Sequence, residues 1–185
     1  MDIDKTIKLR HSVRKFSTKS VSWRDILKAI DSARLAPLAG NLNAMRFILV
    51  ENNDKIKKLA QACQQGFVAS VPYIVVVCSD KEQLIRSYDD SGIKFAAQQS
   101  GAAIENLWLK LVSLGLSTCW VGAFADEQVK HILNIPDSIE VEEILTIAYE
   151  LDKGKQRVKP NLDEVLFFDS WKNKYMEKVE KPEAS

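Results

Sequence analysis

A chain of 185 residues is long enough for one domain with a sizeable core, and we expect a single domain over residues 1–185, with a polar tail from about residue 175. Hydrophobic residues make up 46% of the sequence and charged residues 28%, which is typical of a folded globular protein and excludes a disordered one. The net charge of +1 gives no general attraction to nucleic acid or to a membrane surface, so neither is expected as a partner.

The cysteines and histidines do not indicate a disulfide or a metal site. Cys63, Cys78 and Cys119 are far apart in apolar stretches, which is typical of buried free thiols in a reducing compartment. His11 and His131 are the only histidines, and neither has a partner at metal-ligand spacing. The chain has no apolar run of membrane-spanning length, and its charged N-terminus does not resemble a signal peptide. We therefore expect a cytoplasmic protein without a metal centre.

Hydrophobic periodicity predicts strands that alternate with helices. Helices are expected over residues 3–9, from Ser22 to the residue before Pro37, and over residues 55–63, 91–114 and 127–133. Strands are expected over residues 45–50, 72–78, 144–149 and 165–168, and residues 116–124 fit either a strand or a loop. Ser22 and Asp25 resemble a capping box at the start of the second helix. Residues 72–78 are continuously apolar, which predicts a central strand covered on both faces.

A basic stretch follows the first expected helix and contains Arg10, His11, Ser12 and Arg14. Arginine is the side chain best suited to a phosphate group, because its planar fork can donate two parallel hydrogen bonds. Side chains alternate between faces in an extended segment, so Arg10, Ser12 and Arg14 would point the same way. The stretch is therefore either a one-sided cradle for a phosphorylated ligand or a solvated basic turn.

Two other segments also allow two interpretations each. The loop over residues 37–44 contains Asn41 and Asn43, whose amides can bind a ligand, but an ordinary turn has the same composition. The helix expected over residues 91–114 is apolar nearly all round and rich in small residues between Ala96 and Ala103. Such a helix is either partly covered by a second subunit or the central core helix of a monomer.

The familiar catalytic and phosphate-binding motifs are absent from the sequence. No two of the 7 glycines are spaced as GxG, so both the dinucleotide fingerprint and the P-loop are missing, and no GxSxG elbow is present. What remains is the basic stretch, the amide-bearing loop and a second basic cluster formed by Lys153, Lys155, Arg157 and Lys159. These parts suit the binding of an organic cofactor that brings its own reactivity.

Four segments together resemble the FMN-dependent nitroreductase family in order and spacing. They are Arg10-x-Ser12-x-Arg14-x-Phe16, Ala36-Pro37-x-Ala39-x-Asn41, the run from Gly115 to Phe124, and Lys159-Pro160-x-Leu162-x-Glu164-Val165. The resemblance implies an α+β fold with a mainly antiparallel central sheet flanked by helices, where alternation alone would suggest a parallel sheet. It also implies an intertwined homodimer with two FMN sites at the interface, the long apolar helix forming the dimer core.

The resemblance implies which residues contact a tightly bound FMN. The residues expected at the phosphate and ribityl chain are Arg10, His11, Ser12, Arg157 and Lys159. The residues expected at the flavin ring are Arg14 at the pyrimidine edge, Asn43 near the ring edge, and Gly122 and Ala123 beside the ring. The residues expected to come from the partner subunit are Pro37, Leu38, Ala39 and Asn41. Either Gln64 or Gln65 could also reach the flavin.

The activity implied is ping-pong hydride transfer from NADH or NADPH, through flavin N5, to a nitroaromatic, a quinone or a similar small acceptor. No side chain need act as an acid or base, because Arg14 and the Gly122 backbone N–H only tune the flavin. Asn43, Ala44 and Met45 depart from the family's pattern, which leaves the acceptor open. The alternatives are a reductive dehalogenase, a flavin-degrading relative and a non-catalytic flavin-binding protein.

Overall fold

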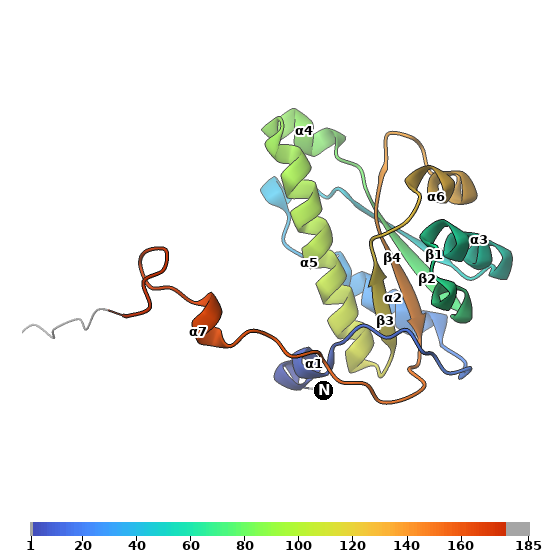
Figure 1. Cartoon of the computed structure of the whole chain (residues 1–185). Coiled ribbons are helices and arrows are strands. Elements are labelled where there is room, and N and C mark those ends of the chain that lie inside the picture. The colour runs from blue at the N-terminus through green and yellow to red at the C-terminus, as the bar shows by residue number, and fades with distance from the viewer. Residues whose placement is uncertain (1, 177–185) are drawn as a thin grey trace, which may run out of the picture.

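The computed structural model describes residues 2–176, which form a four-stranded sheet with helices on both faces (Figure 1). The strands are β1 (Met45–Val50), β2 (Tyr73–Ser79), β3 (Ser117–Val121) and β4 (Glu140–Ala148). The helices are α1 (Ile3–Leu9), α2 (Trp23–Ala33), α3 (Asn53–Cys63), α4 (Glu82–Tyr88), α5 (Ser91–Ser113), α6 (Asp126–Leu133) and α7 (Leu162–Val165). Two short 3-10 turns, η1 (Ala39–Asn41) and η2 (Gly66–Ser70), complete the list.

The sheet has the strand order β1-β2-β4-β3, and every neighbouring pair is antiparallel. The α+β fold with an antiparallel sheet, which the resemblance implied, is therefore confirmed. The expected central strand is confirmed too, because β2 lies between β1 and β4 and is buried from Ile74 to Ser79. The strand expected over residues 144–149 begins earlier, at Glu140, and residues 117–121 are an edge strand.

Each face of the sheet carries its own hydrophobic core, since successive side chains of a strand point to opposite faces. Ile74 and Val76 of β2 pack in the core that includes α3 and α6, whereas Val75 and Val77 pack in the core that includes α2 and α5. Figure 1 shows the same arrangement, with α5 on one side of the strands and α3 and α6 on the other. The sheet is thus the middle of three layers, and helices cover both of its faces.

Helix α5 is buried on one side only within a single chain. Ala96 and Ala103 are fully buried, whereas Ile93 is 48% exposed and Ala97 is also exposed. The apolar residues that seemed to surround this helix therefore belong to two faces, one turned inward to the chain's own core and one turned outward. The outward face is available for contact with a second subunit, although the structure contains one chain.

Helix α2 begins where it was expected, but the capping box is absent. Ser22 occupies the N-cap position without a side-chain hydrogen bond to the helix. The carboxylate of Asp25 accepts a hydrogen bond from Lys28 Nζ at 2.8 Å, so it is turned along the helix surface. A carboxylate can pair with an i+3 lysine as readily as it can cap a helix. The apolar pattern of this segment would place Leu27 and Leu35 on the buried face, but they are 45% and 67% exposed.

The C-terminal part differs most from the expected elements. The strand predicted over residues 165–168 was wrong, because α7 ends at Val165 and Leu166 to Phe168 pair with no strand. The aromatic side chains there pack locally instead, with the rings of Phe167 and Trp171 centred 4.8 Å apart. Helix α4 was not predicted at all. Most of the expected polar tail lies outside the described residues.

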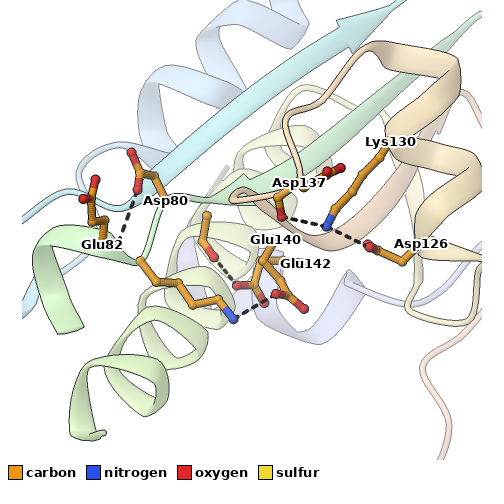
Figure 2. Close-up of polar contacts among 9 residues, drawn as sticks. Asp80, Glu82, Asp126, Lys130, Asp137, Glu140 and Glu142 are labelled. Carbon is orange, nitrogen blue, oxygen red and sulfur yellow. Dashed lines mark hydrogen bonds and ion pairs between the residues drawn. The ribbon is translucent and has the colours of Figure 1, made fainter. Parts of the chain in front are cut away.

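The acidic side chains near the start of β4 are held by cations and a hydroxyl (Figure 2). Lys81 Nζ lies 3.0 Å from a carboxylate oxygen of Glu140, and the Ser79 hydroxyl donates to Glu142. Lys130 on α6 lies 3.0 Å from Asp126 and donates to the carbonyl of Asp137 at 3.3 Å. Within residues 2–176, no group of three or more His, Cys, Asp or Glu side chains is arranged to hold a metal ion.

All cysteines are free and buried. Burial raises the pKa of Cys63 and of Cys78 to about 11, and burial also raises the pKa of Cys119. These thiols are therefore protonated at neutral pH and serve as small apolar side chains. Among the described helices, none is both long and apolar enough to cross a lipid bilayer.

At Gly92 the backbones of α4 and α5 lie close together. A Cβ atom at Gly92 would lie 2.5 Å from the backbone carbonyl of Leu84 and 2.6 Å from the backbone nitrogen of Ile85. We expect Gly92→Ala to lower the free energy of unfolding by about 1–3 kcal/mol, because backbone atoms cannot rotate away from the added methyl group. Gly66→Ala is the matched control, since its methyl group would meet nothing within 4 Å. Denaturant unfolding measures both effects, and a Gly92→Ala variant as stable as Gly66→Ala would contradict the close packing.

Candidate functional site

The N-terminal segment after α1 is fixed against the edge strand β3. The backbone N–H of Val13 donates to the carbonyl of Thr118 at 3.0 Å, and the Val13 side chain is buried. Ser12 and Arg14 are exposed on either side of Val13, as the alternation of an extended segment predicts. The fold thus buries one side of this segment and turns its polar side chains outward.

A cavity of about 280 Å³ lies between this segment and the C-terminal basic cluster. The residues that line it are Arg10, His11, Ser12, Arg14, Lys155, Gln156, Arg157 and Lys159. We call this cavity the basic pocket. It brings together the two basic clusters that the sequence placed at opposite ends of the chain. The lining residues, all within the described part of the chain, include five cations and no carboxylate.

Arg10 and Arg14 are each placed by an aromatic ring. The guanidinium of Arg10 lies 4.6 Å from the ring centre of Trp108 on α5, and its Nε lies 3.5 Å from a carboxylate oxygen of Glu105. The guanidinium of Arg14 lies 5.7 Å from the ring centre of Phe67 in η2. Stacking on a ring limits the motion of a long side chain while leaving its N–H groups free at the edge. The position of each guanidinium is therefore restrained by a ring.

The C-terminal cluster is fastened to the N-terminal segment by specific contacts. The side-chain amide of Gln156 donates to the carbonyl of Arg10 at 2.9 Å. The imidazole of His11 contacts the carbonyl of Leu9 at 2.7 Å and the carboxylate of Glu150 at 3.0 Å. His11 lines the basic pocket, but both of its ring nitrogens contact groups of the chain that do not line it, so its expected contact with FMN stays a prediction.

Gly122 and Ala123 follow β3 directly and are exposed. A Cβ atom at Gly122 would lie 2.9 Å from a carboxylate oxygen of Glu143 on β4. Burial raises the pKa of the Glu143 carboxyl group, and that oxygen is buried with no hydrogen-bond partner among residues 2–176. No sequence motif singles out Glu143, because only the pairing of β3 with β4 brings it to Gly122.

The loop with Pro37, Leu38, Ala39 and Asn41 lies elsewhere in the chain. Gly40 in η1 packs against Tyr88 of α4, and Ala39 and Leu42 pack on a small core that includes Leu84 and Ala96. Figure 1 shows this loop near the α4 end of α5, whereas the N-terminal segment crosses near the α1 end. None of the four residues lines the basic pocket of its own chain. Their contribution from a partner subunit stays a prediction.

Asn43, which was expected near the flavin edge, also serves local structure. Its side-chain oxygen accepts a hydrogen bond from the Met45 N–H at 2.9 Å, which shapes the entry into β1. Either Gln64 or Gln65 was expected to reach the flavin. Gln64 is exposed at the left-handed C-cap of α3, and Gln65 is half-buried.

Other residues near the basic pocket were missed at the sequence level. Lys155 was visible in the second basic cluster but was not assigned to the ligand. Gln156, Glu105, Trp108 and Glu150 gave no signal, because their roles depend on contacts between segments far apart in the sequence. Only the periodicity of α5, with Glu105 and Trp108 three residues apart, could have shown that these two share a helix face.

Comparison with known proteins gives one consistent result. The model of the Nitroreductase family matches residues 7–70 and 60–149. A protein of Archaeoglobus fulgidus, provisionally named an NADH dehydrogenase/NAD(P)H nitroreductase, is 31% identical over 154 residues, which cover 80% of this chain and 86% of that protein. The similarity therefore extends over most of both chains.

Solved structures agree with the sequence comparison. A nitroreductase family protein of Clostridium novyi NT has a TM-score of 0.76 at 28% identity, covering 97% of this chain and 100% of the other. An FMN-dependent nitroreductase of Clostridium difficile has a TM-score of 0.77 at 26% identity, covering 90% of this chain and 98% of the other. Since the family model spans well over half of the sequence, the chain belongs to the nitroreductase family and is an oxidoreductase.

Proposed function

We propose that the protein is an FMN-dependent NAD(P)H oxidoreductase that reduces a nitroaromatic, a quinone or a similar small acceptor. The observation that carries this proposal is the basic pocket, in which residues 10–14 and 155–159 meet around a cavity of about 280 Å³. The names of two similar proteins support the proposed hydride donor and cofactor. The Archaeoglobus fulgidus protein is named for NAD(P)H, and the Clostridium difficile protein is named for FMN. Free, buried cysteines support a reducing compartment, and we place the protein in the cytoplasm.

The donor set of the pocket fits the phosphate group of FMN. Arg10, Arg14, Arg157, Lys155 and Lys159 offer only hydrogen-bond donors, and the hydroxyl of Ser12 can donate as well. A phosphate monoester carries between one and two negative charges at neutral pH and has three acceptor oxygens. Each hydrogen bond between charged groups contributes roughly 1.5–3 kcal/mol. A few such bonds are enough to retain the cofactor.

Bound FMN would supply the redox chemistry, taking hydride from NAD(P)H at N5 and passing it to an acceptor in a ping-pong cycle. The protein's own groups would hold and polarise the ring. Arg14 would place a positive charge at the pyrimidine edge, where it stabilises negative charge. The exposed backbone at Gly122, which has no side chain, would let the ring edge approach β3 closely.

We also propose that two chains form a homodimer with a flavin site at the interface. Beyond the basic pocket the C-terminal segment leaves the body of the molecule (Figure 1). Its apolar side chains are largely exposed, with Val158 at 100%, Leu162 at 72% and Trp171 at 80%. Apolar side chains in such an extended segment are stabilised when a second chain covers them. The outward face of α5 offers a matching surface.

The redox proposal is tested by adding NADH or NADPH anaerobically to the protein loaded with FMN. We expect at least one nucleotide to bleach the flavin absorbance, and a nitroaromatic or quinone added next to restore it. A protein that binds FMN but is bleached by neither nucleotide would exclude the reductase.

The phosphate-binding role is tested with Arg10→Ala. Losing one charge-assisted hydrogen bond should weaken FMN binding by about 10- to 100-fold, since about 1.4 kcal/mol corresponds to tenfold. Flavin fluorescence quenching measures the dissociation constant. Arg86→Ala is the matched control, because Arg86 lies exposed on α4 and pairs only with Glu82 of the same helix. An unchanged affinity in Arg10→Ala would remove Arg10 from the site.

The dimer is tested with a charge on the outward face of α5. Ala103 is buried in its own chain, so a charge there would damage the fold itself, whereas Ala97 is exposed. We expect Ala97→Glu to shift the protein from dimer to monomer on gel filtration and to release flavin at the same time. Gln61→Glu on the opposite helix layer, also exposed, is the control. A monomeric variant that retains its flavin would contradict an interfacial site.

A further inference from the structure

The imidazole of His11 contacts two hydrogen-bond acceptors at once. Nδ1 lies 2.7 Å from the backbone carbonyl oxygen of Leu9, and Nε2 lies 3.0 Å from a carboxylate oxygen of Glu150. A neutral imidazole carries one N–H and can satisfy one of these contacts, whereas the imidazolium donates from both nitrogens. The side chains are largely shielded from solvent, at 16% exposure for His11 and 26% for Glu150. Both contacts can therefore be hydrogen bonds donated by the ring only when both nitrogens carry a proton.

We propose that His11 and Glu150 are positioning residues that hold the basic arm, residues 153–159, against residues 10–14, and that this contact is complete when His11 is protonated. The arm carries Lys155, Arg157 and Lys159 into the basic pocket. The proposal rests on the proposed function, because the pocket that the arm completes is the one assigned to the FMN phosphate. Neither residue would touch the reacting atoms.

Gly154 connects the ion pair to the arm. The carboxylate oxygen of Glu150 that faces His11 also accepts the backbone N–H of Gly154 at 3.3 Å. A Cβ atom at Gly154 would lie 2.5 Å from His11 Nε2 and 3.0 Å from its Cδ2. The ring can therefore reach Glu150 only because residue 154 has no side chain. One carboxylate oxygen thus joins the N-terminal segment to the start of the arm.

The charges around His11 explain why Glu150 matters. Lys5 and Lys153 line a neighbouring cavity that His11 also borders, and they repel a positive ring. The cations that line the basic pocket on its other side do the same, and they are Arg10, Arg14, Lys155, Arg157 and Lys159. Glu150 is the carboxylate that the structure places in contact with the ring. Glu105 at the same end of the molecule pairs with Arg10.

A second contact holds the arm independently of His11. Gln156 donates to the carbonyls of Arg10 at 2.9 Å and Ile7 at 3.4 Å, and these amide contacts do not titrate. Loss of the His11–Glu150 pair should therefore weaken the pocket without removing it. Protonation of His11 completes the contact, so phosphate binding should be stronger at lower pH.

The test compares FMN binding by His131→Gln and by His131→Gln/Glu150→Gln between about pH 5.5 and 8.5. His131→Gln is present in both proteins, so His11 is the one histidine that remains in each of them. At the acidic end of this range, we expect the double variant to bind FMN about tenfold more weakly than His131→Gln, because it lacks one charge-assisted contact. The ratio of the two dissociation constants should approach one as pH rises. The phosphate of FMN titrates near pH 6 in both proteins and cancels in the ratio.

Riboflavin, which lacks the phosphate, is the matched ligand, and its affinity should be the same in both proteins at every pH. Glu140→Gln is the matched protein control, because Glu140 also pairs with a lysine but at the far end of β4. Gly154→Ala should reproduce the effect of Glu150→Gln by displacing the ring. An FMN ratio that does not change with pH, or an equal loss for riboflavin, would overturn the positioning role.

A second measurement needs no flavin. Trypsin cleavage after Lys153, Lys155 and Arg157, followed by mass spectrometry, reports how firmly the arm is held. We expect faster cleavage at these sites in Glu150→Gln than in the wild type at about pH 6, and equal rates there would overturn the proposal. If the wild type binds no FMN, the proposed function fails, and the cleavage rates still decide whether His11 and Glu150 hold the arm.

Discussion

Mutual repulsion among five cations in one pocket is the constraint that the rest of the site must overcome. Charges of one sign that share a small cavity push its walls apart unless something else holds them. Here the backbone holds them, through the Val13–Thr118 hydrogen bond and the short pairing of Phe16 with Glu150. Glu105 and Glu150 compensate part of the charge from outside the cavity. The net result is a positive potential fixed in position, which would lower the reorganisation that binding of the proposed phosphate requires.

The antiparallel sheet determines where this pocket can form. Because β3 is an edge strand, its outer side is free to accept the N-terminal segment. Because β4 runs beside β3 and ends at Ala148, the chain that leaves it passes the same edge and delivers the arm there. The same strand pairing brings Glu143 to Gly122. One edge of one sheet thus gathers residues from the N-terminal segment, from β3 and β4, and from the C-terminal segment.

The parts that the sequence predicted well are those that depend on local periodicity. Residues 72–78 were recognisable as a central strand, because an uninterrupted run of β-branched side chains has few other places in a fold. Arg10, Ser12 and Arg14 were recognisable as a set, because an extended segment alternates its faces. The parts that failed depend on competition between contacts. Asp25 pairs with Lys28 instead of capping α2, and Phe167 packs on Trp171 instead of joining a strand. The strand order, and with it the Glu150–His11 contact, follows from long-range packing that periodicity does not encode.

The two walls of the basic pocket come from the opposite ends of the polypeptide, residues 10–14 and residues 155–159. A ribosome makes the chain from the N-terminus at about 5–20 residues per second, so the first wall exists while most of the sheet is still missing. The second wall is made only after all four strands of the sheet. The proposed phosphate site would therefore form late in synthesis, and a chain that stopped before Lys155 would lack one of its walls.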